Sequence, residues 1–212
     1  SIQSALFALL SLLLGFNLAM ASSRFDARRS LVQDEVNAIA TTYLRAGLLP
    51  RPQQAEVVAL LRTYLDSRLA FMGAGSDQDR MDAADARSSQ LEMQLWAQTT
   101  GPAPTPAANA LLVQSLNEMI NLKWKRRTMM DNHVPQPVIA LLLGVAIGAL
   151  SIVSYGYGLA GPRRHASTAV YAVLVALVLA VILDLDRPRG GLIRVPEDGM
   201  LRLKAAFDRD AK

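Results

Sequence analysis

Three arginines follow the first long apolar stretch of the sequence. Residues 2–21 contain no charged side chain, and Arg24, Arg28 and Arg29 come soon after them. In a symmetric assembly these side chains would surround an opening with positive charge, which attracts anions and favours their entry into a pore. The same arginines could simply anchor a membrane helix at its cytoplasmic end. Taken alone, the three residues favour anchoring.

Two polar residues lie near the end of the same stretch. Asn17 and Ser22 lie on a helix that is otherwise suited to lipid, and polar groups in that position tend to face protein or water. Together with the arginines they define the candidate residues of a pore or its mouth, which are Asn17, Ser22, Arg24, Arg28 and Arg29.

Neighbouring carboxylates at Asp34 and Glu35 offer a second possible chemistry. Acid–base catalysis or the binding of a divalent cation could use such groups. Adjacent residues of a helix point about 100° apart, so the two carboxylates cannot readily hold one ligand. Glu35 could instead pair with Arg28 or Arg29 on a neighbouring turn. The pattern favours a structural ion pair.

A further charged group follows the last apolar stretch and contains Asp184, Asp186 and Arg187. A bare carboxylate at the edge of a membrane is costly, so Asp184 needs a partner. Arg187 or an arginine after the first apolar stretch is the expected one. An ion pathway is the alternative, but the pattern favours a structural ion-pair cluster.

Gly144 and Gly148 form a GxxxG pattern inside another apolar stretch. This pattern permits the close approach of a second helix, from the same subunit or from a neighbouring one. The two glycines are therefore predicted helix-packing positions.

Several classes of function are excluded by composition. The chain has no cysteine and two histidines, so it offers no disulfide framework or thiolate zinc site. It contains no nucleophile triad, phosphate-binding loop or dinucleotide-binding motif. We expect neither an enzyme nor a bound cofactor or metal. The net charge is +4, but the basic residues cluster beside apolar stretches and so indicate membrane topology rather than nucleic-acid binding.

Three apolar stretches, residues 2–21, 138–160 and 168–183, are candidates to cross a bilayer as helices. The sequence therefore predicts an all-α membrane protein: three transmembrane helices with a helical cytoplasmic insertion between the first and second. The expected parts are residues 1–21 as transmembrane helix 1, 22–136 as a helical cytoplasmic segment, 137–186 as a transmembrane hairpin, and 187–212 as a polar, poorly periodic cytoplasmic tail.

Helix boundaries follow from glycine, proline and apolar periodicity. The first span is expected to continue as an amphipathic helix until Gly47 and Pro50 end it. Pro52 is expected to open a second soluble helix. Two more helices are predicted at residues 77–98 and 107–130, separated by a proline-rich linker at residues 101–106. The excess of Arg and Lys places the insertion and the tail in the cytoplasm.

Four blocks of sequence resemble a known family. They are Gly15-Phe16 with residues 23–29, residues 34–39, residues 116–120 with Arg126-Arg127, and residues 183–189 with 191–194. In this order they are similar to the bestrophin-like domain proteins, a family of bacterial membrane proteins. The resemblance implies a distant relation to true bestrophins, which are pentameric chloride channels with a helical cytosolic region. Their acidic calcium clasp and aromatic neck are not found in this sequence.

The expected function is that of an oligomeric ion channel for anions, lined by the first span and its amphipathic extension. It would be a multi-pass protein of the bacterial inner membrane, in contact with lipid and with further copies of itself. The alternative is a non-conducting membrane scaffold or an accessory subunit of a larger complex. A ring of Asn17, Ser22 and Arg28 around an axis would favour the channel, and their burial against an unrelated partner would favour the scaffold.

Overall fold

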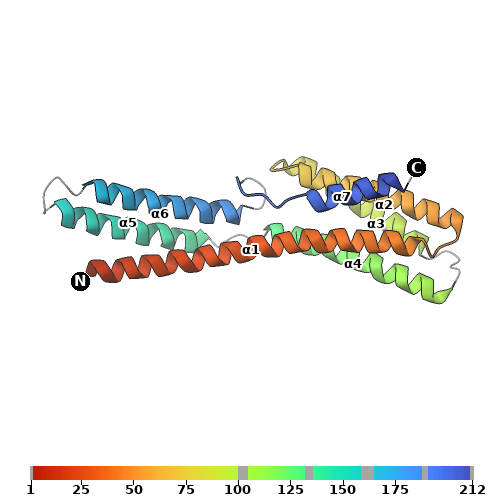
Figure 1. Ribbon diagram of the computed structural model, residues 1–212, viewed down its shortest axis with the longest axis horizontal. Coiled ribbons are helices and arrows are strands. Elements are labelled where there is room, and N and C mark those ends of the chain that lie inside the picture. Colours follow the sequence, from red (N-terminus) through yellow and green to blue (C-terminus); the bar gives the residue numbers. More distant parts are fainter. Residues whose placement is uncertain (1, 100–104, 132–135, 159–164, 188–190, 211–212) are drawn as a thin grey trace. The chain divides into compact units, whose positions relative to one another are not determined.

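The computed structural model describes residues 2–99, 105–131, 136–158, 165–187 and 191–210. Within these ranges all regular secondary structure is α-helical (Figure 1). The helices are α1 (Ile2–Ala46), α2 (Arg51–Gly73), α3 (Gln78–Gln98), α4 (Pro106–Asp131), α5 (Gln136–Gly158), α6 (His165–Asp186) and α7 (Asp198–Arg209).

The chain forms two compact units. Unit 1 comprises Ser1–Asp26 and Asn132–Arg194, and unit 2 comprises Ala27–Asp131 and Val195–Lys212. The helix α1 contributes its first part to unit 1 and its second part to unit 2. The expectation that the first span continues as a polar helix is confirmed.

The length of α1 follows from its sequence. No proline interrupts it, and no glycine occurs between Gly15 and Gly47, so nothing in the chain terminates the hydrogen-bond ladder before that point. The helix ends at Ala46, where the backbone N–H of Gly47 donates to the carbonyl of Leu44 at 3.1 Å.

Unit 1 packs α5, α6 and the first part of α1 around a small apolar core. Leu10 and Leu14 of α1, Leu142 and Ala146 of α5, and Ile182 of α6 are among its buried residues. The outer surface is also apolar. Two helices, Ser4–Ala46 and Ala169–Asp186, are long and apolar enough to cross a membrane, and 17% of each apolar window is buried. Such low burial is unlike the core helix of a soluble protein and is typical of a helix that faces lipid or other subunits.

Among the described residues two helices qualify as candidate spans, whereas the sequence predicts three. The apolar part of α5 that the structure describes, Pro137–Ile152, is shorter than the two long candidate spans. The all-α fold is therefore confirmed, and the count of three transmembrane helices stays a prediction.

Unit 2 is a bundle of the second part of α1 with α2, α3, α4 and α7. As expected, α2 carries a proline in its first turn, where the missing N–H has no intrahelical partner to lose. The side chain of Asp77 caps α3 by accepting from the backbone N–H of Arg80 at 3.1 Å. The linker predicted at residues 101–106 lies largely outside the described residues.

The C-terminal helix α7 differs from the expectation of a poorly periodic tail. Met200 and Phe207 are buried on one face of it, one heptad apart, and Leu203 packs partly against the same core. The ring of Phe207 stacks on Tyr43 of α1, with centroids 4.0 Å apart. The apolar residues of this helix are few and are separated by charged residues, so the sequence shows only a weak helical pattern. The end of the chain is therefore part of the unit 2 bundle.

Candidate functional site

The outward face of α1 in unit 1 carries mainly small side chains. Residues spaced by three and four along one face of the helix are exposed: Ala8, Leu12, Gly15, Ala19 and Ser22. Three large exposed side chains, Leu9, Phe16 and Met20, lie on the adjoining face. One side of the helix therefore suits lipid, while the side with Gly15, Ala19 and Ser22 leaves room for another helix or for water. The same spacing continues into exposed polar residues at Asp26 and Arg29.

The five candidate pore residues do not share one face of α1. Ser22 and Arg29 are exposed on the outward face. Asn17, Arg24 and Arg28 lie about 100–160° around the helix from them, because each residue adds about 100°. Asn17 is half-buried, and its Nδ2 donates to the carbonyl of Leu13 at 2.8 Å. Arg28 is buried in unit 2.

An ion pair joins α1 and α6 in unit 1. Nη1 of Arg24 lies 3.3 Å from Oδ1 of Asp186, whose side chain is 8% exposed. The structure thus brings an arginine that follows the first span to a carboxylate of the last one. The partner is Asp186, whereas the sequence had suggested this role for Asp184.

Asp184 is held by backbone groups. Its Oδ1 accepts from the N–H of Leu192 at 2.8 Å, and its Oδ2 accepts from the N–H of Ile193 at 2.9 Å. Arg187 is exposed beside it. Asp184 therefore ties Leu192 and Ile193 to the C-terminal end of α6. A Cβ at Gly191 would meet Oδ1, Cγ and the backbone O of Asp184 at 2.8, 2.9 and 2.9 Å.

Replacement of Gly191 by alanine should weaken unit 1. The added methyl group would meet a backbone atom as well as a side chain, and overpacking of this kind costs about 1–3 kcal/mol. Thermal unfolding of the purified protein would measure the change. Gly73→Ala is the matched control, because a Cβ at Gly73 meets nothing within 4 Å. Equal melting temperatures for the two variants would contradict the close contact.

The predicted packing glycines face open space within the chain. A Cβ at Gly144 or Gly148 would meet no atom within 4 Å, and both residues are exposed on α5. The described residues therefore supply no partner helix for this pattern. Contact with a neighbouring subunit stays a prediction.

A buried ion cluster holds the helices of unit 2 together. Glu35 of α1 is fully buried and accepts from Nε of Arg68 on α2 at 2.6 Å and from Nη1 of Arg126 on α4. Arg68 also lies 3.6 Å from Asp85 of α3. The expectation of a structural ion pair at Glu35 is thus correct in kind. Its partners come from α2 and α4, and no signal local to α1 could have found them.

A second buried carboxylate, Glu92 of α3, lies near this cluster. It accepts from Nζ of Lys123 at 3.0 Å and from the hydroxyl of Tyr64 at 3.2 Å. Burial raises the pKa of Glu92 by more than its bonds to Lys123 and Tyr64 lower it, so the pKa lies above its usual value. Burial would also raise the pKa of Glu35, but Arg68 and Arg126 outweigh it and leave that pKa below its usual value. The pKa values of the two carboxylates are therefore shifted in opposite directions.

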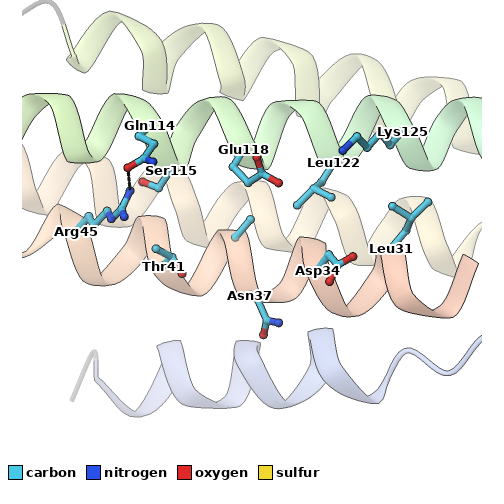
Figure 2. Close-up of a pocket in the computed structure, with 11 residues that line it drawn as sticks. Leu31, Asp34, Asn37, Thr41, Arg45, Gln114, Ser115, Glu118, Leu122 and Lys125 are labelled. Carbon is cyan, nitrogen blue, oxygen red and sulfur yellow. Dashed lines mark hydrogen bonds between the residues drawn. The ribbon is translucent and has the colours of Figure 1, made fainter. Parts of the chain in front are cut away.

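A groove of about 510 Å³ lies between α1 and α4 in unit 2 (Figure 2). Its lining residues are Leu31, Asp34, Asn37, Ala38, Thr41 and Arg45 from α1, and Gln114, Ser115, Glu118, Leu122 and Lys125 from α4. At one end Nη1 of Arg45 bridges to α4, donating to the carbonyl of Leu111 at 2.6 Å and to Oε1 of Gln114 at 3.3 Å. The other charged residues that line the groove are Asp34, Glu118 and Lys125.

Comparison with known proteins defines the class of this fold. Two solved structures of a bacterial bestrophin homologue from Klebsiella pneumoniae, each carrying a point mutation, match the chain with TM-scores of 0.73. They are 13% and 14% identical to it, cover 98% of this chain, and are themselves covered over 86% and 84% of their length. The chain therefore has the all-helical fold of a bestrophin-type membrane protein.

The family follows from the sequence itself. The model of the bestrophin-like domain matches residues 4–200. The chain belongs to the bestrophin-like domain family, as its four sequence blocks indicated. No curated protein matches it significantly.

Proposed function

We propose that the protein is an oligomeric ion channel whose pathway is lined by the outward face of α1. The observation that carries this proposal is the exposed row of small and polar residues, Gly15, Ala19 and Ser22, on a helix that is otherwise apolar. Such residues suit an axis shared by several copies, since they leave space for water and supply a hydroxyl group. The bestrophin-like fold supports the same function.

The preference for anions is assigned to Arg29. Arg24 is paired with Asp186, and Arg28 is buried, so Arg29 is the exposed member of the three arginines. A ring of arginines lowers the entry barrier for anions. Asp26 lies about one turn before Arg29 on the same face and acts in the opposite direction.

Current through purified protein in liposomes tests the proposal. Under a chloride gradient the reversal potential should lie on the anion side. Arg29→Glu should shift it toward cations, and Asp26→Asn should shift it further toward anions. Arg87→Glu, on the exposed surface of α3, should leave it unchanged. Silent liposomes with correctly assembled protein, over a range of voltage and pH, would favour the non-conducting scaffold.

The proposed location is the bacterial inner membrane, with residues 22–136 and 187–212 in the cytoplasm. The excess of basic residues beside the spans supports this orientation. Since the chain has no native cysteine, cysteines introduced at Ser76 and Thr105 would be the only labelling sites. They should react with an impermeant maleimide only after the inner membrane is permeabilised. Reaction of both in intact cells would reverse the orientation.

Contact between subunits in the membrane is proposed at Gly144 and Gly148 of α5. Both are exposed, and two glycines one turn apart permit a neighbouring helix to approach closely. Gly144→Leu and Gly148→Leu should reduce the oligomer mass in detergent. Unchanged mass and melting temperature for both variants would count against this contact.

A further inference from the structure

The segment after α6 carries the most exposed large apolar side chain in the part of the chain that the structure describes. Leu192 is 97% exposed, and its neighbour Ile193 is 42% exposed. Scattered exposed leucines are common on protein surfaces and need no explanation. These two residues differ, because hydrogen bonds to their backbone hold them at one end of an apolar helix.

Asp184 of α6 accepts those hydrogen bonds. Its Oδ1 accepts from the backbone N–H of Leu192 at 2.8 Å, and its Oδ2 accepts from that of Ile193 at 2.9 Å. The two bonded N–H groups belong to the two residues with exposed apolar side chains. An unpaired N–H is costly in lipid, where no water can accept from it. Leu192 and Ile193 therefore meet a requirement for entering the edge of a bilayer.

Asp184 lies on the outer face of α6. The large exposed side chains of this helix are all aliphatic, and they are Val170, Val173, Leu174, Leu177 and Val181. Asp184 follows Leu177 by seven residues and Val181 by three, so it continues the same face. It also lies in the last turn of the candidate membrane span Ala169–Asp186. Leu192 and Ile193 thus extend an apolar face past a carboxylate that would otherwise interrupt it.

Lipid fits this face better than a neighbouring subunit does. Valine and leucine side chains that project from a span with 17% of its apolar window buried suit fluid acyl chains. Close helix packing in membranes uses small residues, such as Gly144 and Gly148 of α5, where the subunit contact is proposed. The bulky outer face of α6 therefore favours the bilayer as its partner.

The charges near the segment are compatible with a bilayer surface. Asp184 is bonded to two N–H groups, and Asp186 is paired with Arg24 at 3.3 Å. Arg187 and Arg194 are exposed. Their long side chains can place the guanidinium groups among lipid phosphates while the carbon stems stay against apolar surface.

We propose that Leu192 and Ile193 insert into the lipid at the end of α6, and that Asp184 holds them there. Acyl chains would contact the two apolar side chains, and lipid phosphates would contact Arg187 and Arg194. The inference rests on α6 as a membrane span, and it applies to a channel and to a non-conducting scaffold alike.

A spin label at position 192 tests the insertion. Since the chain has no native cysteine, Leu192→Cys gives one site for a nitroxide in the purified protein, which is then reconstituted into liposomes. Collisions of the nitroxide are measured with oxygen, which concentrates in lipid, and with a polar nickel complex, which stays in water. Leu177→Cys on the outer face of α6 is the lipid reference. Leu201→Cys, at a leucine of α7 that is 51% exposed, is the matched control.

The ratio of oxygen to nickel collisions at position 192 should exceed that at position 201 by at least about fivefold, because apolar solutes concentrate in lipid. Equal ratios at these two positions would place the segment in water and overturn the proposal. Few collisions with either reagent at position 192 would mean that protein covers it, which would favour a second copy and overturn the lipid contact. A water-like ratio at position 177 would overturn α6 as a span, and the proposal with it.

Removal of the carboxylate tests the role of Asp184. In the chain labelled at position 192, Asp184→Ala leaves both N–H groups without their acceptor, so collisions with the nickel complex should rise toward the level at position 201. Asp184→Asn keeps one acceptor oxygen and should give an intermediate value, with less effect on folding. Collision rates that are unchanged in both variants would overturn the role assigned to Asp184.

Discussion

Replacement of Glu35 by alanine should lower the free energy of unfolding of unit 2 by more than any replacement of an exposed carboxylate. The side chain is fully buried and contacts both Arg68 and Arg126. Its removal would leave Arg126 without a carboxylate partner among the described residues and Arg68 with Asp85 alone, 3.6 Å away. Breaking a buried ion pair in this way costs about 3–5 kcal/mol. Chemical unfolding of the purified protein, followed by circular dichroism, would measure the loss.

Glu56→Ala is the matched control for this prediction. Glu56 is an exposed carboxylate of α2, and it makes no salt bridge among the described residues. Its removal should change the free energy of unfolding by about 0.5 kcal/mol or less. If Glu35→Ala were as mild as the control, the ion cluster would not be the element that fixes α2 and α4 on α1.

Replacement of Phe207 by alanine should detach α7 from unit 2. The ring is 3% exposed and stacks on Tyr43. In addition, Nη2 of Arg62 donates to the backbone carbonyl of Phe207 at 2.9 Å. Loss of a buried phenylalanine costs about 3–5 kcal/mol through lost burial and the cavity left behind. Hydrogen exchange should become faster throughout α7.

The comparison for this variant is Met93→Ala on α3. Met93 is a large apolar side chain, but it is 66% exposed, so its removal creates no cavity and should leave the exchange of α7 unchanged. The reverse order of the two effects would mean that α7 is held mainly by its polar contacts, among them the ion pair between Lys204 and Asp66.

Local features of the sequence predicted most of the helices because their signals are continuous or lie at the ends of elements. The uncharged stretch before Ser22, the glycine and proline after Ala46, and the proline at the start of α2 each act within a few residues of the boundary they set. Capping at Asp77 belongs to the same class. These effects need no knowledge of the tertiary structure.

The partners of buried charges could not be predicted in the same way. Glu35 lies near Arg28 and Arg29 in sequence, yet it is Arg68 and Arg126 that reach it in the folded bundle. The choice depends on which helices pack together, and that information is spread over the whole chain. Asp184 was misleading for a related reason, since its partners are backbone N–H groups, which every residue but proline carries.

The opposite pKa changes of Glu35 and Glu92 give the bundle an internal compensation against acid. The pKa of Glu92 lies above its reference value of 4.5, so the folded state takes up a proton there before the unfolded chain does. Its contribution to stability is lost as the pH rises through the folded pKa and is regained as the pH falls toward 4.5. The pKa of Glu35 lies below 4.5, so its contribution is present above that pH and is lost only in stronger acid. As the surroundings turn mildly acidic, the bundle therefore gains from one carboxylate before it loses from the other.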